Sequence, residues 1–79
     1  MRIRYDPSVD ALYLRFDLRK QDVNTVEVSG DINVDLGDDD RLVGIEVLDA
    51  SKNLDLKALL HLDVEVQGAP DLVQVPARA

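Results

Sequence analysis

The first half of the chain alternates between apolar and polar residues with a period of two, and this pattern restricts the folds that it can adopt. Apolar residues recur at alternate positions in four runs, which are Ile3–Tyr5, Leu12–Phe16, Val26–Val28 and Ile32–Val34. Successive side chains of a β-strand point to opposite faces, so each run predicts a half-buried strand. Burial on one face only is typical of antiparallel sheets.

The segments between these runs contain residues that favour chain reversal. Asp6–Ser8, Ser29–Asp31 and Gly37–Asp40 are rich in aspartate, glycine, serine and proline, which are common in tight turns. Parallel strands need a crossover of a dozen or more residues. We therefore expect consecutive strands to be joined by hairpins into an antiparallel β-meander.

The next run, Leu42–Leu48, differs because both parities carry apolar residues. Its odd positions continue the core face, whereas Leu42 and Leu48 flank Gly44 and Glu46 on the other face. A strand that is apolar on both sides is normally covered on both sides. We expect the cover to come from the chain's own helix or from a second subunit.

Leucines at helical spacing predict a short amphipathic helix from about Leu54 to Leu62, with Ser51 or Asn53 as its cap. Alternation returns, more weakly, over residues 63–66 and 72–75. The whole pattern predicts an α+β fold, an antiparallel β-meander of about five strands with one short helix in the C-terminal half packed on the sheet. We expect a single β-rich domain over residues 1–66 and an extension over residues 67–79 with a short strand and a frayed end.

Composition limits the partners of such a chain. The 79 residues include 16 acidic and nine basic side chains, for a formal charge of −7, and no cysteine. The negative field disfavours direct binding to nucleic acid and to anionic membranes, and it suits a basic protein partner. Disulfides are excluded, no stretch reaches the ~20 apolar residues of a membrane span, and the cytoplasm is the default location.

Acidic residues supply the only candidates for chemistry. The Asp35–Asp40 loop could attract a cation, but its spacing does not match the helix-flanked calcium loop, so a solvated turn is favoured. For Glu46 and Asp49 we favour a structural ion pair over catalysis, with Arg15 a possible partner of Glu46. The single histidine, His61, has no cysteine nearby and no adjacent ligand. We expect no catalytic residue, cofactor or metal.

Two segments resemble a family of short bacterial and archaeal proteins, the domain of unknown function 2283 family. They are Ile3–Leu14, with a tyrosine–aspartate opening and an Asp-Ala-Leu-Tyr strand, and Asp40–Ser51, with a Gly-Ile-Glu segment. The resemblance covers about two thirds of the chain and implies a small β-rich fold with a short helix and no established activity. Members often have glycine where this chain has Asp40, which leaves the turn type open. Some relatives are thought to be encoded beside toxin-like proteins, which implies an antitoxin-like or partner-binding role.

Our leading hypothesis is a small acidic, non-enzymatic interaction module that acts as a homodimer and binds a basic partner. The dimer is expected through the second sheet face around Ala11, Tyr13, Leu42 and Leu48, because that face is predicted to be apolar. The alternative is a small enzyme or cation-binding protein that uses Asp10, Glu46, Asp49 or the Asp35–Asp40 loop. The interface and family-motif positions are Tyr5, Asp6, Asp10, Ala11, Tyr13, Leu42, Gly44, Glu46, Leu48 and Asp49.

Overall fold

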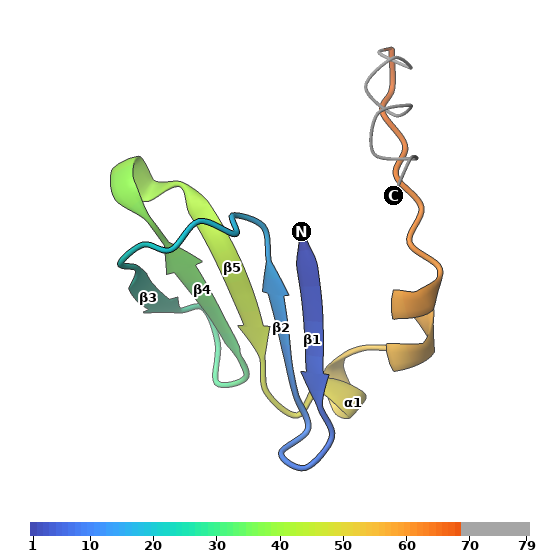
Figure 1. Cartoon of the computed structure of the whole chain (residues 1–79). Coiled ribbons are helices and arrows are strands. Elements are labelled where there is room, and N and C mark those ends of the chain that lie inside the picture. Colours follow the sequence, from blue (N-terminus) through green and yellow to red (C-terminus); the bar gives the residue numbers. More distant parts are fainter. Residues whose placement is uncertain (69–79) are drawn as a thin grey trace.

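A single antiparallel sheet of five strands forms the body of the molecule (Figure 1). The computed structural model describes residues 1–68 of the chain. Each of the five expected strands is present, although all four residues of the third strand are exposed and not half-buried as expected. Their bounds are Arg2–Asp6 for β1, Ala11–Arg15 for β2, Asn24–Glu27 for β3, Ile32–Leu36 for β4 and Leu42–Val47 for β5.

The order of the strands corrects the prediction of a simple meander. The sheet runs β1-β2-β5-β4-β3, so β2 pairs with β5 and β3 lies at the far edge. Three hairpin-linked strands, with a fourth joined by a longer connection, make a Greek-key arrangement. The connection from β2 to β3 spans residues 16–23, and Figure 1 shows it crossing one end of the sheet. The start of this connection is held by Arg15, whose Nε donates a hydrogen bond to the carbonyl of Asp17 at 2.8 Å.

Pairing divides the side chains into two faces. We call the apolar face the side of the sheet that carries Tyr5, Leu12, Val47 and Ile32 in one row of paired residues. The adjacent row on that face contains Ile3, Leu14, Ile45, Val34 and Val26. We call the opposite side, with Arg4, Tyr13, Glu46 and Asn33 in one row, the polar face.

The core is small and covers one half of the apolar face. In the described residues the buried apolar side chains are Leu12, Val43, Val47 and Ala50. Leu12, Val47 and Ala50 form one cluster, against which Leu56 and Leu59 pack as the leucine spacing predicted. No member of the row from Ile3 to Val26 is buried, although this row crosses all five strands.

The helical region corrects the expected single helix over residues 54–62. It consists of one turn of α-helix, α1 (Ala50–Asn53), and a 3₁₀ segment, η2 (Leu56–Leu60). The first begins after Asp49, which has left-handed backbone, and not at Ser51 or Asn53. The second is capped by Asp55, whose carboxylate accepts from the Lys57 amide at 3.1 Å. Leucines three residues apart also fit the 3₁₀ period, which explains the ambiguity.

Four aspartates adopt the left-handed backbone region that favours glycine. They are Asp10, Asp39, Asp40 and Asp49, with φ between 48° and 57°. Asp39 and Asp40 belong to a short 3₁₀ turn, η1 (Asp38–Asp40), between β4 and β5. Asp40, whose turn type the sequence left open, has a φ of 57°, a conformation in which glycine is preferred.

Two further expectations concern the C-terminal part. Residues 63–66 form no strand in the single chain. The segment 72–75, and most of the expected extension, lie outside the described residues. Within residues 1–68, no helix has the length and apolar character needed to cross a membrane.

Candidate functional site

The family-motif residues Tyr5 and Asp10 meet Ser51 in a hydrogen-bonded cluster at one end of the sheet. The Tyr5 hydroxyl donates to Asp10 Oδ1 at 2.7 Å, and the Ser51 hydroxyl donates to Oδ2 at 2.7 Å. The Ser51 amide also donates to this carboxylate, and the Ala50 amide donates to the Asp10 carbonyl at 2.9 Å. Asp10 therefore joins the β1–β2 turn to the start of α1.

The electrostatics of this cluster follow from its hydrogen bonds. Donation from Ser51 and Tyr5 stabilises the charged carboxylate, so the pKa of Asp10 lies below its usual value. The same bond holds the phenolic proton and raises the pKa of Tyr5. Asp6 accepts from the amide and hydroxyl of Ser8 in the adjoining turn, which lowers its pKa. The arrangement satisfies each acid with local donors, as a structural link requires.

A second cluster lies on the polar face and explains Gly44. The Tyr13 ring crosses above Gly44, where a Cβ would collide with it, and its hydroxyl donates to Asp35 Oδ2 at 2.6 Å. Thr25 donates to the other oxygen of Asp35 at 2.6 Å. Burial, and then the bond to Asp35, raise the pKa of Tyr13 to about 12. The close approach anticipated for Gly44 is made by Tyr13 across the sheet.

Glu46 also receives a partner, but not the expected one. The side-chain amide of Asn33 donates to Glu46 Oε1 at 3.1 Å from the neighbouring strand. Arg15, proposed from the sequence, instead donates to the carbonyls of Asp17 and Arg19. Sequence reasoning named Asp35 only as part of a possible cation loop and did not single out Asn33 or Thr25. The parity of residues 33 and 35 nevertheless places them on the face opposite the apolar positions of β4.

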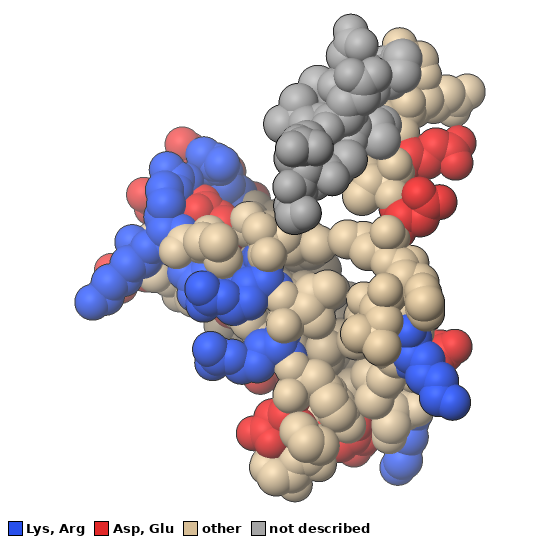
Figure 2. Space-filling view, turned by 45° about the vertical axis from the view of Figure 1, so that its right-hand side comes forward, with Lys and Arg blue, Asp and Glu red and all other residues tan. Residues whose placement is uncertain are grey.

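Arginines that are dispersed along the sequence come together on the polar face. Arg2, Arg4 and Arg15 line a hollow of ≈ 220 Å³ beside Tyr13, and Arg2 pairs directly with Arg15 across β1 and β2. Figure 2 shows a group of Lys and Arg side chains (blue, left). Part of this face is therefore basic, while the interface predicted around Ala11, Tyr13, Leu42 and Leu48 stays a prediction. Leu42 and Leu48 are 44% and 36% exposed.

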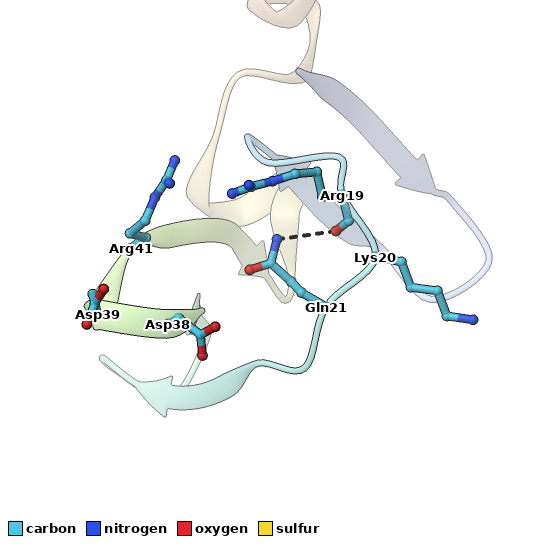
Figure 3. A pocket seen from close by; sticks show the side chains of 6 residues that line it. All are labelled: Arg19, Lys20, Gln21, Asp38, Asp39 and Arg41. Carbon is cyan, nitrogen blue, oxygen red and sulfur yellow. Dashed lines mark hydrogen bonds between the residues drawn. The ribbon is translucent and has the colours of Figure 1, made fainter.

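The acidic loop lies beside basic residues. Asp38 and Asp39 share a hollow of ≈ 290 Å³ with Arg19, Lys20 and Arg41, and Gln21 in this hollow donates to the Arg19 carbonyl at 3.2 Å (Figure 3). Guanidinium and ammonium groups at this position oppose a bound cation. Within residues 1–68, no group of three or more metal-ligating side chains is close enough together to hold a metal ion.

The remaining candidates do not converge on a common site. Besides these two hollows, a third lies around Phe16 and Leu42, and a groove of ≈ 430 Å³ lies between β1 and η2. None of these four is lined by Asp10, Glu46 or Asp49. Asp49 acts as the cap residue of α1, and His61 is an exposed cap at the end of η2.

The fold and its clusters define a small antiparallel-sheet domain in which the motif residues tie structural elements together. The family described as "Protein of unknown function (DUF2283)" matches residues 2–51, and the chain belongs to this family. The match ends at Ser51, the residue that donates to Asp10. Neither the curated proteins nor the solved structures provide a match to this chain.

Proposed function

We propose that this chain is a non-catalytic interaction module that works as a homodimer through its apolar face. The supporting observation is the row of Ile3, Leu14, Ile45, Val34 and Val26, whose end members Ile3 and Val26 are 36% and 40% exposed and whose other members are half-buried. A contiguous apolar row in water is unfavourable by about 25 cal/mol per Å² of exposed apolar surface. A partner that covers this row removes that cost.

The charge distribution favours a second copy as the partner. All nine residues of the two apolar rows are uncharged, in a chain with a formal charge of −7. A two-fold interface places the same patch on both subunits, so it must be compatible with itself. Two apolar sheets can pack face to face about 10 Å apart without bringing like charges together.

The same face is open along β3 and β4. Val26 is 40% exposed and Val28, in the following turn, is 63% exposed, whereas Leu56 and Leu59 cover the face near β1 and β2. The half of the sheet without a helical cover is the half on which we place the second subunit. This differs from the interface expected around Tyr13 and uses the opposite side of the sheet.

Oligomeric state tests the proposal directly. Val26→Lys inserts an ammonium group into the proposed interface, and Thr25→Lys is a matched control with the same charge change on the polar face of the same strand. By analytical ultracentrifugation we expect a dimer for the wild type and for Thr25→Lys, and a dissociation constant raised about 100-fold or more for Val26→Lys. The proposal is contradicted if the wild type sediments as a monomer at 100 times its cellular concentration. It is also contradicted if the two lysine substitutions raise the dissociation constant equally.

The proposal also includes an antitoxin-like role, in which the module binds a basic protein that is not a copy of itself. Asp31 and Asp49 lie together near α1, where the Asn53 amide donates to the Asp31 carboxylate at 3.2 Å and to the Asp49 carbonyl at 3.2 Å. With Asp6 at the end of β1, this end of the sheet suits a basic surface. Binding of such a partner there leaves the apolar face available for the second copy.

A further inference from the structure

Strand β1 is an edge of the sheet, and its polar face carries two arginines. It pairs with β2 alone, so its other row of backbone groups is open to a further strand. Arg2 and Arg4 project on the polar face and Ile3 and Tyr5 on the apolar face. Within residues 1–68 the one ion pair joins Arg19 to Asp17, so neither Arg2 nor Arg4 meets a carboxylate of this part of the chain.

Residues 62–66, which we call the arm, have the complementary pattern. The sequence Leu-Asp-Val-Glu-Val alternates apolar side chains with two carboxylates. Leu62 is 64% exposed and Val64 47% exposed, and the arm makes no hydrogen bond to the rest of the described chain. Figure 1 shows it leaving η2 and running upward, whereas β1 runs downward. The arm is thus a strand-like sequence that has no strand partner among residues 1–68.

We propose that the arm of one copy pairs antiparallel with β1 of a second copy, an inference that rests on the homodimer proposed above. With Asp63 opposite Arg4, Glu65 falls opposite Arg2. Val64 then faces Ile3, and Leu62 faces Tyr5. A shift by one residue would put both carboxylates on the apolar face. A shift by two residues would place Asp63 opposite Asp6 in one direction and lose a charge pair in the other.

The conformation of the single chain favours β1 of a second copy, rather than the arm's own β1, as the partner of the arm. A segment attached close to its binding site has an effective concentration in the millimolar range, so an accessible edge in the same chain would be occupied. Within residues 1–68 neither the arm nor the outer edge of β1 is paired with a strand, and η2 packs beside β1, with Leu56 and Leu59 against the cluster that Tyr5 also contacts. Reciprocal exchange between two copies covers both edges at once.

Charge reversal tests the exchange, because it can be made on either side of the pair. One variant carries Arg2→Glu and Arg4→Glu, and the other carries Asp63→Arg and Glu65→Arg. Each variant alone sets like charges opposite each other, so we expect its dimer dissociation constant to rise about tenfold or more. An equimolar mixture restores opposite charges at both edges of the heterodimer, and its dissociation constant should return to within about threefold of the wild type.

Each other result overturns the inference in a distinguishable way. A mixture no tighter than its components, together with recovery in one chain that carries all four changes, would show that the arm pairs with its own β1. Charge variants that dimerise like the wild type, while Val26→Lys does not, would exclude the arm and retain the apolar-face dimer. A monomeric wild type would remove both proposals. Circular dichroism checks that each variant is folded.

Discussion

Gly44→Ala is the sharpest test of the polar-face cluster, because Tyr13 occupies the space that the new methyl group needs. A Cβ on Gly44 would overlap the Tyr13 hydroxyl and lie 2.5 Å from the ring carbon Cζ. It would also lie 2.9 Å from the backbone carbonyl oxygen of Leu14. The ring must therefore move, and its 2.6 Å hydrogen bond to Asp35 is lost.

The size of the effect follows from three contributions. Overpacking costs about 1–3 kcal/mol, and a hydrogen bond to a charged group is worth about 1.5–3 kcal/mol. Replacing glycine within a strand returns about 0.5–1 kcal/mol, and water replaces part of the lost bond because Tyr13 is only half-buried. We expect a net loss of about 2–4 kcal/mol, a large share of the ~4–12 kcal/mol typical of a chain this size.

A double-mutant cycle measured by urea denaturation separates the ring from the backbone. Wild type, Gly44→Ala, Tyr13→Ala and the double variant are compared at one protein concentration, since dimerisation contributes to stability. With the ring removed, the cost of Gly44→Ala should fall to about 1 kcal/mol or less. Equal costs in both backgrounds would refute the role of Tyr13 and assign the effect to the Leu14 carbonyl.

Two further predictions concern single residues. The pKa of Tyr13 is raised from 10.0 to about 12, so the folded chain holds this proton more tightly than the unfolded chain. The associated stability is complete below pH 10 and is lost as the pH rises through 12. An absorbance titration should lose its highest tyrosinate transition in Tyr13→Phe, and an unchanged curve would contradict the assignment. Asp40→Gly should raise the free energy of unfolding by about 0.5–1 kcal/mol, because Asp40 has φ 57°. Asp38→Gly, at a neighbouring position without positive φ, is the control and should not raise the melting temperature in thermal denaturation.

The strands were predictable because their signal is local. Alternation in segments such as Ile32–Val34 needs only the neighbouring residues to specify two faces, and all five strands appear. Strand order is not local in this sense. The hairpin rule places β3 beside β2, but residues 16–23 are long enough to carry the chain across the end of the sheet, so β5 takes that position.

The candidate site shows the same limit. Tyr13 and Asp35 are separated by 22 residues and Asp10 and Ser51 by 41, so their contacts depend on the register and not on the adjacent sequence. The resemblance singled out Tyr5, Asp10 and Gly44 without indicating what they touch. Once the register is known, the parity of Asp35 and the absence of a side chain at Gly44 explain the path of the Tyr13 ring.

The position of β5 between β2 and β4 has a consequence for the order of synthesis. The β1–β2 and β3–β4 hairpins touch each other through β5 within this sheet, and an isolated two-stranded hairpin is at best marginally stable in water. Before Val47 leaves the ribosome, the nascent chain holds two hairpins without a common core. The last strand within residues 1–68, β5, is therefore the one that joins the two hairpins into a domain.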